Sequence, residues 1–196
     1  MHKKYIPILA LLLTACFLAF SGCEINISTN GSNNPLVGGS PSSSTSHPSS
    51  TSHLGKQTKK SVCFAHGGLP DSACTPGAIF TNATTQQICT YGYTKKVRNV
   101  PSSEKDQVYA EYGIQYHSPG QYEVDHLIPL ELGGSNDIAN LWPEAASPKP
   151  GFHEKDKVEN YLHDQACSGA ISLQAAQSQI ATNWLAVYHR MPAQYQ

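Results

Sequence analysis

Several features are scarce or absent in this sequence, and each absence excludes a class of protein. After residue 23 no apolar run is long enough to cross a bilayer, which excludes a membrane-spanning segment from that part of the chain. No two cysteines have the Cys-x-x-Cys spacing, so the sequence offers no typical structural zinc site. Basic residues are few in residues 61–196, which hold eight Lys and Arg against thirteen Asp and Glu. That balance disfavours a tight, sequence-reading nucleic-acid binder, because such proteins present a basic face.

The first 23 residues have the composition of an export signal. Lys3 and Lys4 form a basic start, and the apolar residues 6–20 follow, a length typical of a signal peptide and short for a membrane span. The sequence Phe-Ser-Gly-Cys that ends at Cys23 resembles the lipobox of bacterial lipoproteins, whose cysteine is lipidated and becomes the N-terminus. We therefore predict lipidation at Cys23, with Cys16 as an alternative site and a plain secretion signal as a further alternative.

Residues 24–60 are predicted to be a disordered tether, and residues 61–196 to be one domain. The tether is rich in Ser, Thr, Asn, Pro and Gly, so it cannot bury enough apolar surface to offset the entropy lost on ordering. Together the signal segment and the tether predict a protein held on the bacterial cell envelope by a lipid anchor. We expect it to be a monomer. If the anchor is absent, the same features predict a secreted protein.

Four cysteines lie in the predicted domain, an even number that indicates two disulfides in an exported protein. Four cysteines allow three pairings, and spacing does not choose among them. We favour a local Cys63–Cys74 bond and a long Cys89–Cys167 bond, which would tie the upstream part of the domain to its last helices.

The most informative segment is residues 122–143, which reads YEVDHLIPLELGGSNDIANLWP. Its first residues mix aromatic and β-branched side chains with polar ones, as in a half-buried strand, and the following Gly, Ser, Asn and Asp residues are typical of a turn. Neighbouring strand residues point to opposite faces, so Asp125 and His126 cannot both reach one site from a regular strand. We expect a bulge or the strand end near Pro129 to re-aim one of them.

This segment resembles the core of the HNH endonucleases, which belong to the ββα-metal nucleases. The resemblance extends in order through weaker motifs over residues 74–190. It implies an α+β fold in which a hairpin and a helix, residues 122–165, form the ββα-metal core. Additional helices and the disulfides would complete the domain.

The resemblance also implies a role for each site residue. His126 would be the general base, Asn140 would fix the hairpin and the base, and Asp125 would bind the metal. His153, the first histidine after Asn140, would be a second metal ligand, with Asp156 as the competing candidate. One divalent ion is implied, Mg²⁺ by preference, with Mn²⁺, Ni²⁺ and Zn²⁺ as alternatives.

Helix-capping and helix-terminating residues predict three helices. Residues 103–112 begin with a capping-box pattern and stop at Gly113, and residues 153–165 form the second helix. Ser172 is expected to cap a last helix that ends near Tyr188, with apolar residues at helical spacing that we assign to the core.

The sequence therefore predicts a metal-dependent endonuclease of low specificity that cuts DNA, with RNA left open as the substrate. The acidic balance of the domain points to weak substrate binding, and Lys95, Lys96 and Arg98 are its only basic cluster, a candidate for phosphate contact. The alternative is a catalytically inactive envelope lipoprotein that uses the same scaffold to bind a partner.

Overall fold

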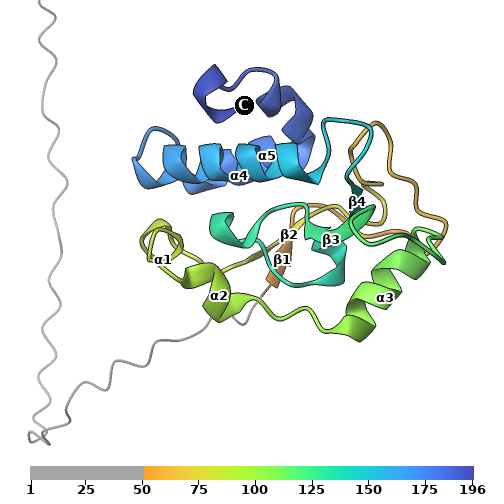
Figure 1. The fold of residues 1–196 in the computed structure, drawn as a ribbon. Helices are drawn as coiled ribbons and strands as arrows, with labels where there is room; N and C mark the ends of the chain where they lie inside the picture. Colours follow the sequence, from red (N-terminus) through yellow and green to blue (C-terminus); the bar gives the residue numbers. More distant parts are fainter. Residues whose placement is uncertain (1–50) are drawn as a thin grey trace, which may run out of the picture. The chain divides into compact units, whose positions relative to one another are not determined.

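The computed structural model describes residues 51–196, which form a mixed helical and antiparallel sheet structure closed by two disulfides (Figure 1). The predicted signal, the lipidation candidates Cys16 and Cys23, and the predicted tether up to residue 50 lie outside the described residues. The α+β class predicted from the sequence is confirmed. None of the helices within residues 51–196 is both long enough and apolar enough to cross a membrane.

A short two-stranded sheet opens the described part of the chain. Strand β1 (Thr51–His53) pairs antiparallel with β2 (Ala78–Phe80). The chain after β1 stays attached, because the backbone nitrogens of Leu54 and Thr58 each donate at 2.8 Å, to the carbonyls of Gly77 and Ala73. Residues 51–60, which the sequence assigns to the tether, therefore belong with the folded residues. Backbone hydrogen bonds hold them, together with polar side-chain contacts such as Lys59 to Asp71 at 2.7 Å.

Three helices connect the two sheets, α1 (Thr85–Ile88), α2 (Tyr93–Val97) and α3 (Ser102–Glu111). Helix α3 corresponds to the predicted helix 103–112, and Gly113, at φ 69°, ends it as expected. The predicted capping box does not form, because the helix starts one residue earlier and Pro101 takes the N-cap position without a side-chain bond.

The predicted hairpin is present as β3 (Tyr122–His126) and β4 (Leu141–Ala145), which pair antiparallel. Two 3-10 turns, η1 (Leu130–Leu132) and η2 (Ile138–Asn140), lie in the connection. The register is regular, with Asp125 opposite Trp142 and His126 opposite Leu141. No bulge re-aims either residue, so the side chains of Asp125 and His126 serve opposite faces of the hairpin.

The chain ends in α4 (Phe152–Cys167), α5 (Leu173–Tyr188) and the short turn η3 (Ala193–Tyr195). Ser172 caps α5 as predicted, because its hydroxyl accepts from the backbone nitrogen of Ala175. Helices α4 and α5 lie together on one side of the β3–β4 hairpin, and α3 lies on the other (Figure 1). The core forms beneath α4 and α5 around Ile128, Leu132, Val158, Leu162, Ile180 and Trp184.

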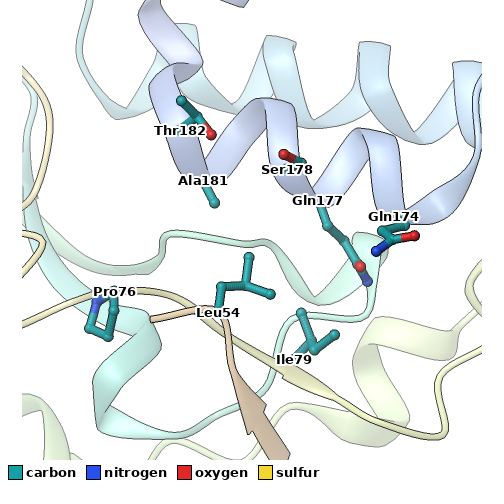
Figure 2. A pocket seen from close by; sticks show the side chains of 8 residues that line it. All are labelled: Leu54, Pro76, Ile79, Gln174, Gln177, Ser178, Ala181 and Thr182. Carbon is teal, nitrogen blue, oxygen red and sulfur yellow. The ribbon is translucent and has the colours of Figure 1, made fainter. Parts of the chain in front are cut away.

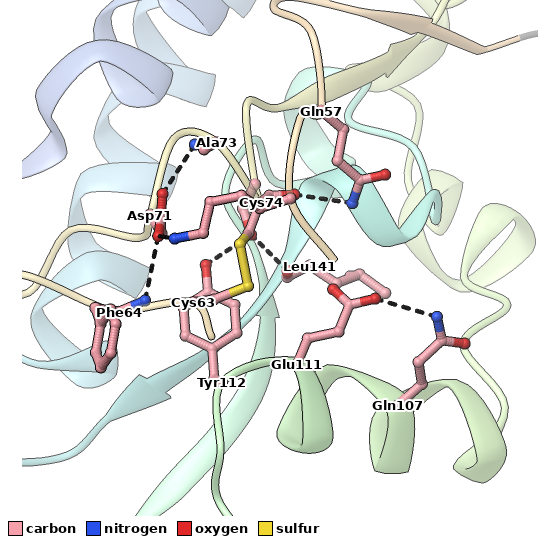
Figure 3. The surroundings of a disulfide bond; sticks show 12 residues. Gln57, Cys63, Phe64, Asp71, Ala73, Cys74, Gln107, Glu111, Tyr112 and Leu141 are labelled. Carbon is pink, nitrogen blue, oxygen red and sulfur yellow. Dashed lines mark hydrogen bonds and ion pairs between the residues drawn. A yellow bond between two sulfur atoms is a disulfide. The ribbon is translucent and has the colours of Figure 1, made fainter. Parts of the chain in front are cut away.

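Both predicted disulfides are confirmed. Cys63–Cys74 spans a sequence separation of 11 and closes the loop in front of β2 (Figure 3). In that loop Asp71 accepts from Lys59 at 2.7 Å. Cys89–Cys167 spans a separation of 78 and ties the end of α1 to the end of α4. In the chain-entropy view these loop lengths correspond to about 3 and about 4 kcal/mol of stabilisation respectively.

Candidate active site

His126 lies at the end of β3 and is almost fully buried, with 1% of its surface exposed. Its Nε2 atom lies 3.2 Å from Oδ1 of Asn136, and an amide oxygen only accepts, so Nε2 carries the proton. Burial lowers the pKa of His126 to about 4, and the positive charges of Arg98 and Lys155 add to this, against the opposing influence of Asp125 and Asn136. The ring is therefore neutral near pH 7, with Nδ1 as its basic atom.

Asn136 is a site residue that sequence reasoning missed. Besides contacting His126, its Nδ2 donates to the carbonyl of Val97 at 2.7 Å, and its Oδ1 accepts from the nitrogen of Asn99 at 3.1 Å. The side chain thus joins the histidine to the segment after α2. The only signal in the sequence is its place in the turn after Gly133, and turn asparagines usually bond to their own backbone.

Asn140 holds the hairpin, but it does not contact the ring of His126. The buried amide donates to the carbonyls of Ile128 and Ser135, both at 2.9 Å, and accepts from the nitrogens of Ile128 at 3.0 Å and Ala78 at 3.3 Å. Two residues therefore share the role that was predicted for Asn140 alone. The bonds support the part that concerns the hairpin, whereas the contact to the base belongs to Asn136.

The side chain of Asp125 lies on the face of the hairpin opposite His126 and points toward α4, where it contacts Lys155. The Lys155 ammonium is completely buried and donates to Asp125 Oδ2 at 2.5 Å and to the carbonyl of His126 at 2.8 Å. It also donates to Glu159 one turn further along α4. Burial opposes both charges, but their attraction dominates, so the pKa of Asp125 is lowered and that of Lys155 is raised. The pair is ionised at neutral pH.

Glu144 is the unusual member of this cluster. Its side chain is 1% exposed, both carboxyl oxygens lack a hydrogen-bond partner within the described residues, and the nearest cation, Lys155, is 4.0 Å away. Burial raises the pKa of Glu144 to about 10, with the negative charge of Asp125 adding to it and Lys155 opposing it. Glu144 is therefore a neutral acid at pH 7, which limits the cost of burying it.

More carboxylates gather where this cluster approaches solvent. Glu123 lies two residues before Asp125 on the same face of β3, and burial raises its pKa to about 7, helped by the charges of Asp125 and Asp156. Partial desolvation, followed by the charge of Asp125, also raises the pKa of Asp156 at the exposed edge of the cluster. Carboxylates that disfavour one another's ionisation in this way repel each other when charged, and a bound cation would reduce that repulsion.

His153, the predicted second metal ligand, is exposed on the first turn of α4, and its ring lies against Phe152 with centroids 4.3 Å apart. No hydrogen bond joins it to Asp125 within the described residues. Across residues 51–196, the compact group of three potential metal-binding side chains lies elsewhere, at Cys89, His163 and Cys167. The charge of Asp125 raises the pKa of the competing candidate Asp156, as described above.

The basic cluster approaches His126 through Arg98. Lys95 and Lys96 occupy the last turn of α2, and Arg98 is its C-cap. All three side chains are exposed, and the charge of Arg98 reaches both His126 and Glu123. Since Asn136 bonds to the backbone on either side of Arg98, this cation is held close to the candidate base.

A groove between β2 and α5 does not share these features. Leu54, Pro76 and Ile79 face Gln177 and its neighbours on α5 across it (Figure 2). None of its lining residues ionises, so it offers no acid, base or metal ligand. The candidate site therefore stays with the β3–β4 hairpin.

Comparisons with models of known protein families, with curated proteins and with solved structures found no match for this chain.

Proposed function

We propose that this chain hydrolyses phosphodiester bonds in DNA with low sequence specificity, as an HNH-type endonuclease. The observation that carries the proposal is the neutral His126 ring, whose Nε2 is fixed by Asn136 and whose Nδ1 is left as a base beside an exposed arginine. The hairpin followed by a helix, β3–β4 and then α4, supports it, because the resemblance in the sequence implies that order of elements.

The chemistry assigned to these residues is a simple displacement. His126 Nδ1 takes a proton from water while the water oxygen attacks phosphorus, and the bond from phosphorus to the leaving sugar oxygen breaks. The leaving oxygen gains its proton from solvent. Arg98 would bind the phosphate and offset its charge, with Lys95 and Lys96 extending the contact along the strand.

A divalent ion remains part of the proposal, and the donors present suit a hard cation. Asp125, Glu123 and Asp156 supply oxygen ligands of the kind that Mg²⁺ prefers, and their mutual repulsion would be relieved by it. Asp125 and Asp156 would hold the ion, with His153 as the alternative second ligand. When bound, the ion would supply positive charge at the Asp125 face of the hairpin, whereas His126 would act from the opposite face.

One observation favours the second candidate function, a catalytically inactive binding module. Lys155 already neutralises Asp125 from the protein interior, and His126 is 1% exposed, so both motif residues have structural partners. In that case the exposed basic cluster of Lys95, Lys96 and Arg98 would bind an anionic partner without cleaving it.

A plasmid-nicking assay on the full chain with Mg²⁺ or Mn²⁺ separates the two functions. We expect the wild-type protein to nick, and His126→Ala to lose about 10²–10⁴-fold in rate, the usual contribution of a general base. His189→Ala, at the end of α5, is the matched control and should nick like the wild type. Absence of nicking by the wild type would favour the binding module, whereas full activity of a folded His126→Ala protein would show that His126 is not the general base.

For location, we propose the bacterial cell envelope with a lipid anchor at Cys23. The two disulfides are compatible with an oxidising compartment outside the cytoplasm. Such a protein would meet nucleic acid outside the cytoplasm.

A further inference from the structure

The Cys89–Cys167 disulfide has a histidine directly beside it. His163 and Cys167 are four residues apart on α4, so they share one face of that helix, and Cys89 faces them from the C-cap of α1. His163 Nε2 lies 3.4 Å from Cys167 Sγ and 3.2 Å from the carbonyl oxygen of Ile88, the neighbour of Cys89. The imidazole thus lies beside the disulfide.

The three potential ligand atoms are close enough to share one ion. One ring nitrogen of His163 and the sulfur atoms of Cys89 and Cys167 all lie within 4.8 Å of one another. In a tetrahedral zinc site with Zn–S bonds of about 2.3 Å, two sulfurs are separated by roughly 3.8 Å. Once the S–S bond is broken, a small separation of the two sulfurs would reach that geometry, because Cys89 is exposed at a helix end.

The second nitrogen of the ring also has a suitable neighbour. His163 Nδ1 lies 3.9 Å from Oδ1 of Asp164, whose side chain is 59% exposed. A metal-binding histidine commonly presents its other ring nitrogen to a carboxylate, which fixes the ring and strengthens the ligand. Solvent reaches the cluster, since Cys89 is exposed and His163 and Cys167 are partly exposed, so an ion can enter and water can complete its coordination.

We propose that Cys89, His163 and Cys167 form a redox-gated site for a thiophilic divalent ion such as Zn²⁺. One dithiol, or two monothiol molecules, supplies two electrons and two protons, which convert the protein disulfide to two thiols while the reductant becomes a disulfide. The ion then binds two thiolates and the imidazole, and the two thiol protons are released to solvent. The oxidised protein has no thiolates to offer, so disulfide and metal exclude each other. Either one ties α1 to α4.

The test is a titration of the full chain with Co²⁺, which reports thiolate ligands through a charge-transfer absorption that carboxylate sites do not produce. The protein is reduced with a phosphine, freed of reductant without air, titrated with Co²⁺, and then back-titrated with Zn²⁺. We expect the band to saturate at one Co²⁺ per chain after reduction, to be absent before it, and to disappear when Zn²⁺ is added.

Variants distinguish this site from adventitious binding. His163→Ala should weaken Co²⁺ binding by at least about tenfold, and Asp164→Asn by a smaller factor, in line with losses of supporting ligands elsewhere. His189→Ala, near the end of α5, should bind like the wild type. Equal binding by His163→Ala and the wild type, or reduced protein without the band, would overturn the proposal.

Loss of folding on reduction is covered by a second measurement. Near-ultraviolet circular dichroism of the reduced chain is recorded with and without Zn²⁺. If reduction loosens the domain, Zn²⁺ should restore the native signal, because the ion replaces the lost tie between α1 and α4. A reduced, unfolded chain that Zn²⁺ does not restore contradicts the proposal. This result is independent of nicking, so it leaves the proposed nuclease function untouched.

Discussion

Lys155 donates from a completely buried position to the carboxylate of Asp125, and the two atoms lie 2.5 Å apart. The bond joins α4 to β3, the two elements that carry the predicted metal ligands. A fixed positive charge in this place lets Asp125 stay ionised inside the protein. It also means that any ion bound by Asp125 shares that carboxylate with the ammonium group.

Lys155→Met should destabilise the domain by about 3–5 kcal/mol, because removing one partner leaves a buried charge without compensation. Urea unfolding, followed by circular dichroism, measures the loss. Lys157→Met, two residues away on the same helix and only partly buried, is the matched control and should change the unfolding free energy by less than about 1 kcal/mol. Similar losses in both variants would show that the Lys155–Asp125 pair makes no particular contribution to the free energy of unfolding.

Asn140→Ala should cost roughly 3 kcal/mol or more, since it leaves several buried backbone groups around Ile128 without partners, each costing about 1–3 kcal/mol. The same urea experiment measures it. Asn160→Ala, on the exposed side of α4, removes one bond to the carbonyl of Asp156 and should stay within about 0.5 kcal/mol of the wild type. If the wild type and Asn140→Ala were equally stable, the hairpin would not depend on this amide.

The hairpin shows how far the sequence could be read. Strand residues, turn residues and the order of elements all follow from local chemistry, so β3, the following turns and the helix α4 were predictable. The opposite orientation of Asp125 and His126 also followed from strand geometry, although we expected a bulge to remove it. The partners of these two residues were not predictable, because Lys155 and Asn136 reach them across 30 and 10 positions of the chain. No local pattern encodes such contacts.

The two disulfides show a similar limit. An even number of cysteines indicated two bonds, and the favoured pairing is the one found. The role proposed for His163 could not be predicted from the sequence. His163 and Cys167 are four residues apart on α4, but the cluster forms only because α1 places Cys89 next to them. The order of residues 51–60 was missed for a related reason. Backbone pairing and the Lys59–Asp71 contact hold this segment, and both involve residues that are distant in the sequence, so its polar composition gave no sign of them.

Asp156→Asn should weaken Mg²⁺ binding by at least about tenfold, and His153→Ala should have a smaller effect, because hard cations prefer oxygen ligands. Asp125→Asn should match or exceed the loss in Asp156→Asn. Isothermal titration of the full chain with Mg²⁺ measures all three. A larger loss in His153→Ala than in Asp156→Asn would restore the histidine as the second ligand.

Asp71 should make the domain more stable at neutral pH than in acid. Its carboxylate accepts from Lys59 at 2.7 Å and from the nitrogen of Ala73 at 3.0 Å, and the lysine bond is the largest cause of its lowered pKa. Because the folded pKa lies below the unfolded value, this stabilisation is present above the unfolded pKa and disappears as pH falls through the folded one.

Asp71→Asn should therefore be less stable than the wild type near neutral pH, and the difference should shrink toward about pH 3. Urea unfolding over that pH range measures both proteins. Asp106→Asn, on the exposed face of α3, should keep the wild-type pH dependence. A constant difference between wild type and Asp71→Asn at all pH values would show that the carboxylate charge is not the cause.

Cys23→Ser should release the protein from membranes while leaving any nicking activity unchanged. The prediction rests on the lipobox-like sequence before Cys23 and on the absence of a membrane-spanning helix among residues 51–196. Fractionation of cells that express the wild type or the variant measures the release, and mass spectrometry reads the mature N-terminus. A lipidated N-terminus at Cys16 would keep the anchor and move its site. A soluble wild-type protein with an unmodified N-terminus near residue 23 would identify an ordinary secretion signal instead of a lipid anchor.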